Sequence, residues 1–498
     1  MNVNPITRLD YPDPDVIRVE DTYYMVSTTM HFMPGCEILQ SFDLVHWEHA
    51  TYVYETLDHT DAQQLKSGQN IYGQGMWAAS LRYHEGRFWI CFVANDTRKT
   101  YLYTSEKIDG PWKKQLIEGF YHDGSLLFDE DGRNYIVYGN DEIWITELNE
   151  DLTAPKKDGL HRLLVSDHKN PELGYEGSHI QKINGYYYIF LVHSLRDRWM
   201  RTEACFYSDS LEGEFTGGDV LCDDRGYCGQ GVAQGGIVDT PDGKWYAMLF
   251  QDSGAVGRLP ILLPVTWKDH FPFFGQNGHV PEEIEVHSTR PGYIYQPLVG
   301  SDDFCNGLLP RWQFNHDPDP RYYHLDALQG TYTITTREVC TELTQAVNTL
   351  TQRMSYPSCA AEVTVDASAL KEGDVAGLCA LQGCYAAVGI TKHHGKYEVL
   401  MLDKKEDGIL DMTEGTVVES HQMDFRLEAD FCNMKDEARC YYRVNKGDWL
   451  PIGTVHKLYF KLDHFTGCRF GLFCYAAEET GGSACFRDFK YYDVDEIS

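Results

Sequence analysis

One hairpin, repeated five times in the first half of the chain, restricts the fold more than any other feature. The clearest copy runs from Ile180 to Phe190 and turns at Asn184-Gly185. Both turn residues tolerate φ > 0, as a type I′ turn requires, and apolar and aromatic residues flank them. The other copies are Val16–Val26, Leu81–Phe92, Leu126–Val137 and Ile237–Met248. A supersecondary unit repeated in this way predicts a radial array, a β-propeller of five blades.

Alignment of the five copies on their turns brings a set of polar residues to equivalent positions. About eight or nine residues before each turn lie Asp13, Trp77-Ala78, Asp123, Glu176 and Gln234. The innermost strand of every propeller blade starts at the same end of the axis, so we expect these side chains to converge on one funnel. Clustered acids repel one another and lose hydration when buried. Three carboxylates at equivalent positions therefore indicate a catalytic role more than a structural one.

The repeat stops after Arg290-Pro291-Gly292, and alternating segments continue from Ser301 onward. We predict strands at Thr331–Thr335, Cys359–Val365, Val375–Leu381, Ala386–Ile390, Tyr397–Leu402, Leu458–Leu462 and Phe470–Tyr475. Short strands at regular spacing without helical periodicity indicate a β-sandwich. The sequence thus predicts an all-β chain, with a five-bladed β-propeller over residues 1–297 and a β-sandwich over residues 301–498. The connection Pro291–Ser301 lacks a flexible composition, so we expect the sandwich to pack on the propeller as a wall of the funnel.

The net charge of −32 narrows the range of partners. Nucleic acids and anionic membranes select for basic patches, so we expect neither to bind this chain. No apolar run reaches membrane-spanning length, and the N-terminus lacks the basic and apolar segments of a signal peptide. The fifteen cysteines lack metal-type spacing and lie mostly in apolar runs. We therefore expect buried, reduced thiols and a cytoplasmic location.

One glutamate beside two aspartates meets the needs of glycosidic bond hydrolysis. One carboxylic acid donates a proton to the leaving oxygen, one carboxylate activates water, and a third acid can raise the pKa of the donor. At this point the chain resembles family 43 of the glycoside hydrolases, five-bladed propellers that act on arabinose- and xylose-containing polymers. The resemblance rests on Tyr11-Pro12-Asp13-Pro14, Met76-Trp77-Ala78, His122-Asp123, Glu176-Gly177-Ser178-His179, Gly243-Lys244-Trp245-Tyr246 and Gly257-Arg258-Leu259-Pro260, in the expected order.

The resemblance implies a role for each of the three acids. Asp13 matches the general base, and Glu176 matches the general acid. Asp123 matches the acid that modulates the pKa of the donor and orients it. The second half looks like the concanavalin-like sandwich that is appended to the family's β-xylosidases.

Three further residues match the family's first sugar site. Trp77 and Phe32 match its aromatic walls, and Arg258 matches an arginine that binds sugar hydroxyls. From the residues alone, Trp77 could equally pack the core, and Arg258 could equally lie on the surface. Many family members carry an axial histidine tied to a bound calcium or sodium where this chain has Gln234. We therefore expect no required cofactor; Gln234 in place of that histidine speaks against a bound calcium or sodium ion, and the occupancy of an ion site stays open.

The predicted function is an exo-acting, inverting glycoside hydrolase that releases terminal pentoses from xylo-oligosaccharides or arabinoxylan. It would act as a β-xylosidase, an α-L-arabinofuranosidase or both. The alternative is a non-catalytic carbohydrate-binding propeller with a lectin sandwich, which predicts loss of at least one of the three acids. An oligosaccharide is the expected partner, and a homo-oligomer is compatible with the sequence. The pentose and the natural polymer stay open.

Overall fold

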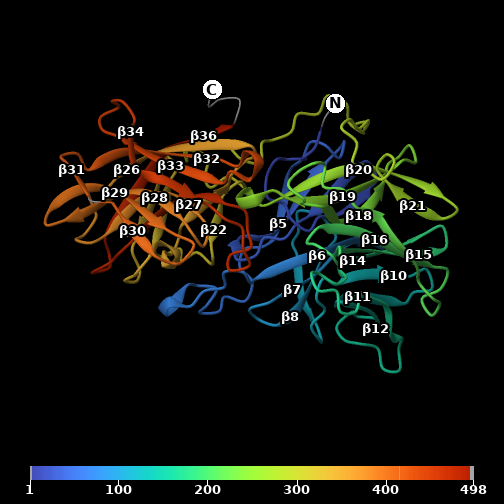
Figure 1. Ribbon diagram of the computed structural model, residues 1–498. Coiled ribbons are helices and arrows are strands. Elements are labelled where there is room, and N and C mark those ends of the chain that lie inside the picture. The colour runs from blue at the N-terminus through green and yellow to red at the C-terminus, as the bar shows by residue number, and fades with distance from the viewer. Residues whose placement is uncertain (1–2, 414, 494–498) are drawn as a thin grey trace.

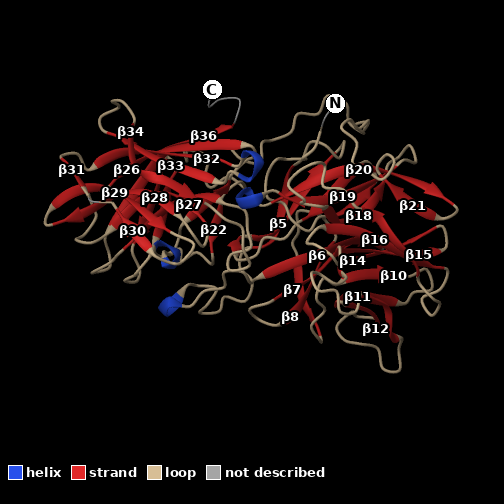
Figure 2. Cartoon of the chain, in the orientation of Figure 1, coloured by secondary structure: helices blue, strands red, loops and turns tan. Residues whose placement is uncertain are grey.

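The computed structural model describes residues 3–413 and 415–493, which form two β-rich bodies side by side (Figure 1). Strands dominate both bodies (Figure 2), which confirms the all-β prediction. The helices of this described part are short 3-10 turns: η1 (Lys66–Gly68), η2 (Gly254–Val256), η3 (Leu343–Gln345) and η4 (Cys432–Met434). Within the same residues, no helix is both long and apolar enough to cross a membrane.

Five four-stranded antiparallel sheets make up the first body within the described residues. The first blade contains β1 (Asp15–Val19), β2 (Thr22–Val26), β4 (Gly35–Ser41) and β5 (Glu48–Tyr54). The second contains β6 (Met76–His84), β7 (Arg87–Ala94), β8 (Lys99–Ser105) and β9 (Lys113–Ile117). The third contains β10 (Ser125–Phe128), β11 (Asn134–Asn140), β12 (Glu142–Leu148) and β13 (His161–Ser166). The fourth contains β14 (Glu176–Ile183), β15 (Tyr186–Ser194), β16 (Arg201–Ser208) and β17 (Thr216–Leu221). The fifth contains β18 (Val232–Asp239), β19 (Trp245–Asp252), β20 (Arg258–Lys268) and β21 (Phe271–Phe274).

The inner strands of the five blades close a ring around the axis. β1 contacts both β6 and β18, and β10 and β14 complete the circle. Each inner strand pairs with the next strand of its blade through the hairpin that the sequence predicts. Asn184 and Gly185 have φ values of 52° and 84°, as the predicted turn requires. The five-bladed propeller is therefore confirmed.

The second body is a sandwich of two antiparallel sheets. One sheet runs in the order β3 (Phe32–Met33), β22 (Gln313–Asn315), β25 (Leu350–Arg353), β35 (Arg469–Tyr475), β27 (Val375–Leu381), β28 (Ala386–His393), β29 (Lys396–Lys404) and β30 (Leu410–Met412), and β31 (Thr416–Val418) also pairs with β29. The other runs β23 (Tyr323–Asp326), β24 (Thr331–Thr335), β36 (Ser483–Asp493), β26 (Ser358–Asp366), β32 (Gln422–Asp430), β33 (Glu437–Arg443) and β34 (Leu450–Lys457). Apolar side chains from both sheets, such as Leu378 and Phe425, are buried in one core between them.

The two bodies share a sheet and a buried ion pair. β3 belongs to the propeller half of the sequence, yet it pairs with β22 of the sandwich. Nearby, the buried Arg353 guanidinium contacts the buried Glu37 carboxylate at 2.8 Å. Because shared strand pairing and an enclosed ion pair both need the two bodies in fixed register, the sandwich is docked rigidly on the propeller.

Candidate active site

A cavity of about 720 Å³ opens at the end of the propeller axis where the inner strands begin. Its lining includes all five residues that the hairpin repeat brings into equivalence: Asp13, Trp77, Asp123, Glu176 and Gln234. Each blade therefore contributes one residue to the same space, and three of the five are acids.

The backbone in front of the inner strands aims these side chains at the cavity. Asp13, Asp123 and Gln234 have left-handed φ values of 52°, 48° and 65°, and Gly177 (67°) follows Glu176. β6, β14 and β18 also shift register at this end. A bulge re-aims a side chain, and non-glycine residues with positive φ concentrate at functional sites.

Two neighbours hold Asp13. Thr28 Oγ1 donates to Asp13 Oδ2 at 2.7 Å, and Arg258 Nη1 donates to Oδ1 at 3.0 Å. Asp13 and Arg258 are both buried. Solvent screens an ion pair this enclosed only weakly, so the Asp13 carboxylate keeps one orientation.

Glu176 is the best exposed of the three acids, and two donors reach one of its oxygens. Asn140 Nδ2 donates to Glu176 Oε2 at 2.7 Å, and His122 Nε2 lies 3.3 Å from the same atom. The same His122 nitrogen lies 3.5 Å from Asp123 Oδ2, which also accepts the Gly177 N–H at 2.9 Å. His122 thus bridges two of the acids.

The enclosure of these groups changes their pKa values. Burial raises the pKa of Asp123 above its usual range, and the charges of Glu176 and Asp13 raise it further, while His122 opposes them. Burial alone would lower the pKa of His122, but the carboxylates of Asp123, Glu176 and Asp13 raise it to about 9. His122 is therefore an imidazolium at neutral pH.

Trp77 and Arg258 both line the cavity and have unused hydrogen-bond donors. Trp77 Nε1 and the Nε and Nη2 atoms of Arg258 are buried without a partner in the described structure. A buried donor without an acceptor lowers stability, so a ligand that supplies hydroxyl oxygens would bind here favourably.

Phe32 is not among the residues that line this cavity. Its side chain is buried, and the Arg469 guanidinium lies 3.4 Å from the centre of its ring. The reason is that Phe32 starts β3, whose pairing with β22 turns it into the junction between propeller and sandwich. Its predicted place in the wall of the sugar site therefore does not match its position.

The sandwich supplies one side of the cavity, as the short connection suggests. The lining residues from this half are Met434, Phe460, Lys461, Leu462 and Phe465. Phe465 lies under the Arg258 guanidinium at 4.3 Å and 5.5 Å from the Trp77 ring. The predicted strand over Leu458–Leu462 is wrong, because β34 ends at Lys457 and the segment instead forms a loop at the cavity.

The arrangement of polar groups argues against a resident metal. His122, Asp123 and Glu176 offer ligand atoms within 4.8 Å of one another. However, Glu176 Oε2 and Asp123 Oδ2 already accept hydrogen bonds from the Asn140 amide and the Gly177 N–H. Further along the axis, Arg82 donates hydrogen bonds to the Asp15 carboxylate, the Ser125 hydroxyl and three backbone carbonyls, so a cation already occupies the axis. The residues therefore do not fit a calcium or sodium ion.

Three carboxyl groups that converge in one pocket with aromatic walls define a glycoside hydrolase type of site. Residues 3–272 match glycosyl hydrolases family 43, and residues 301–492 match the beta xylosidase C-terminal concanavalin A-like domain. The chain belongs to glycoside hydrolase family 43.

Relatives from both sequence and structure agree with this assignment. A beta-xylosidase of Formosa agariphila is 26% identical over 99% of this chain and 89% of its own. A bifunctional GH43-CE protein of Bacteroides eggerthii is 41% identical, with a TM-score of 0.92 over 98% of this chain; this chain spans 63% of that one. An engineered GH43 enzyme with endo-xylanase and exo-arabinofuranosidase activity is 27% identical, with a TM-score of 0.86 over 99% of both chains. The chain is thus a glycoside hydrolase that acts on oligosaccharides.

Proposed function

We propose that this enzyme removes terminal pentoses from xylo-oligosaccharides or arabinoxylan, as a β-xylosidase, an α-L-arabinofuranosidase or both. The observation that carries the proposal is the meeting of Asp13, Asp123 and Glu176 in a cavity that the sandwich walls on one side. A pocket walled in this way accepts a chain end more readily than the middle of a polymer, which favours exo action. The similar proteins include a beta-xylosidase and an enzyme with exo-arabinofuranosidase activity.

Each acid has one task in this mechanism, which inverts the anomeric configuration as in family 43. Asp13, fixed by Thr28 and Arg258, accepts a proton from the water that attacks the anomeric carbon. As the bond to the leaving group breaks, Glu176 gives its proton to the leaving oxygen. Asp123 adds negative charge beside this donor, which favours its protonated form. The free donors of Arg258 and Trp77 bind the hydroxyls of the sugar. The proposed chemistry needs no metal.

The family assignment favours hydrolysis over the alternative, a non-catalytic carbohydrate-binding propeller. All three acids are present and share one cavity, whereas a lectin needs no proton donor or base.

The test compares two variants on two kinds of substrate. Glu176→Gln should lower kcat/KM for xylobiose by on the order of 10³-fold but spare aryl glycosides with good leaving groups, which need little protonation. Asp13→Ala should lower both by a similar factor, because every substrate needs the attacking water. Equal leaving-group dependence in the two variants would show that the acid and base assignments are wrong. A comparison of wild-type kcat/KM for an aryl β-xyloside and for an aryl α-arabinofuranoside then identifies the pentose.

A further inference from the structure

Asn140 lies at a place that the hairpin repeat does not single out, yet it makes the shortest contact to Glu176. It ends β11, the second strand of the third blade, and its Nδ2 donates to Glu176 Oε2 at 2.7 Å. His122 Nε2 approaches the same oxygen at 3.3 Å. Among the described residues, Glu176 Oε1 has no hydrogen-bond partner. The two oxygens of this carboxyl group are therefore in different environments.

We propose that Asn140, together with His122, is a positioning residue that reserves Oε1 of Glu176 for the catalytic proton. This inference rests on the proposed role of Glu176 as the general acid. A carboxyl oxygen that accepts two N–H donors has no lone pair left for its own proton in that plane. The acidic proton is then carried by Oε1, the oxygen that the protein leaves free, and it points to one place in the cavity.

Backbone hydrogen bonds on both sides of Asn140 fix it in place. The Gly139 N–H donates to the carbonyl of His122 at 3.0 Å, and the Asp141 N–H donates to the carbonyl of Tyr175 at 2.8 Å. The turn is therefore tied to the residue that supplies the second donor and to the residue directly before Glu176. A site group held through its neighbours' backbones keeps its geometry better than one on a free loop.

The turn also depends on Gly139. Its φ is 142°, and a Cβ atom at this position would lie 2.0 Å from the carbonyl oxygen of Glu142. Only glycine can bring β11 into β12 this tightly, with Asn140 paired opposite Glu142. The tight backbone at Gly139 thus positions the side-chain amide of Asn140 beside the carboxyl group of Glu176.

The charged groups around Glu176 also distinguish its two carboxyl oxygens. The ionisable groups that share its cavity are Asp13, Asp123, Glu172, Asp252, His122, Arg98, Arg201, Arg258 and Lys461. Of these, His122 is the one in hydrogen-bond range of the Glu176 carboxyl, and it approaches Oε2 rather than Oε1. Both close donors therefore act on one oxygen.

The first experiment replaces Asn140 and compares leaving groups. Asn140→Ala should lower kcat/KM for xylobiose by on the order of ten-fold and change that for an activated aryl xyloside by much less, because only the poor leaving group needs an aligned proton. His122→Asn should show the same dependence. Asn134→Ala, the same change at the other end of the same strand, is the matched control and should behave as the wild type. Asn140 is exposed, and unfolding midpoints check that each variant folds.

The second experiment uses Asn140→Asp, which keeps the shape and adds a negative charge beside Oε2. The alkaline limb of the kcat/KM profile should move to higher pH, since a like charge favours the protonated acid. A structural role alone would leave the limb in place. If Glu176→Gln shows the leaving-group dependence but neither Asn140 variant differs from Asn134→Ala, this inference is overturned and the proposed function stands. If Glu176→Gln keeps wild-type activity on xylobiose, the acid assignment itself fails.

Discussion

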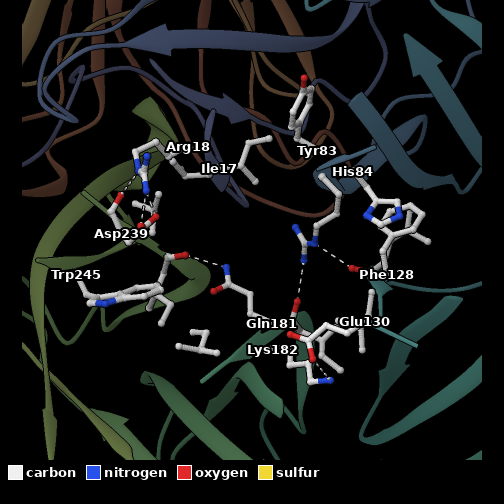
Figure 3. Close-up of a pocket in the computed structure, with 18 residues that line it drawn as sticks. Ile17, Arg18, Tyr83, His84, Phe128, Glu130, Gln181, Lys182, Asp239 and Trp245 are labelled. Carbon is white, nitrogen blue, oxygen red and sulfur yellow. Dashed lines mark hydrogen bonds and ion pairs between the residues drawn. The ribbon is translucent and has the colours of Figure 1, made fainter. Parts of the chain in front are cut away.

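Both ends of the propeller axis hold cavities, but the two differ in the pairing of their polar side chains. At the end opposite the acids, a cavity of about 510 Å³ is lined by all five inner strands (Figure 3). The charged side chains there are paired: Arg18 with Asp239, and Lys182 with Glu130 and with Asp129, which lies outside the lining. At the active-site end, donors of Trp77 and Arg258 are buried without partners.

Two arginines express this difference most clearly. Arg82 uses all three guanidinium nitrogens in five hydrogen bonds that reach four blades. Arg258 uses one nitrogen on Asp13, and the other two have no partner among the described residues. A saturated arginine stabilises the fold, whereas an unsaturated one is held ready for a ligand at a cost in stability. The size of a cavity therefore says less about function than the state of its donors.

The largest expected effect separates these two arginines. Arg82→Met leaves the fully buried Asp15 without its ion-pair partner, so it should lower the free energy of unfolding by about 3–5 kcal/mol. Arg258→Met also leaves a buried carboxylate, that of Asp13, without its ion-pair partner, but the Arg258 guanidinium makes one hydrogen bond where that of Arg82 makes five, so the loss of stability should be smaller. It should also lower kcat/KM by on the order of 10–100-fold, because two donors to the sugar and one donor to the general base are lost. Urea unfolding and kinetics on the same preparations measure both. If the two variants lose equal free energy of unfolding, Arg82 does not stabilise the fold more than Arg258 does, and the contrast between the two ends fails.

Local sequence rules predict the part of the site that the blades repeat. The turn Asn184-Gly185 and the alternating residues around it act over a few positions, so the five hairpins can be found without a structure. Once the hairpins are aligned, the equivalence of Asp13, Asp123 and Glu176 follows from the symmetry of the propeller.

The rest of the site depends on contacts between distant parts of the chain, which no local pattern encodes. Phe32 follows the first hairpin like a residue of the cavity wall, but its strand pairs with residues about 280 positions away. Leu458–Leu462 alternates like a strand and yet forms a loop, which contributes Phe460, Lys461 and Leu462 to the lining of the cavity. Asn140 was missed because it lies on a second strand; the Gly139-Asn140 pair at a strand end was the available signal.

A smaller effect concerns the pH dependence of stability, which should arise at the active-site end. The pKa of His122 is raised from about 6.5 in the unfolded chain to about 9 in the folded protein. Its stabilising contribution is therefore complete below about pH 6.5 and is lost as the pH rises through 9, with an upper limit of about 3 kcal/mol. His122→Asn should reduce the fall in the free energy of unfolding between pH 6.5 and 9.5. Parallel profiles for variant and wild type would contradict this titration.

The smallest expected effect is that of removing metal ions. Arg82 already supplies a cation to the axis, and the Glu176 and Asp123 carboxylates already accept hydrogen bonds from the protein. Exhaustive treatment with a chelator should therefore leave kcat/KM and the unfolding midpoint within experimental error, and added calcium should not raise either. Arg82→Met extends the test, because it removes the axial cation and leaves the Asp15 carboxylate exposed to the vacated space. If calcium restores stability to that variant alone, the arginine replaces a metal at the axis. If the chelator inactivates the wild type, our description of the axis is wrong. A metal then binds where we describe only hydrogen bonds and ion pairs between protein groups.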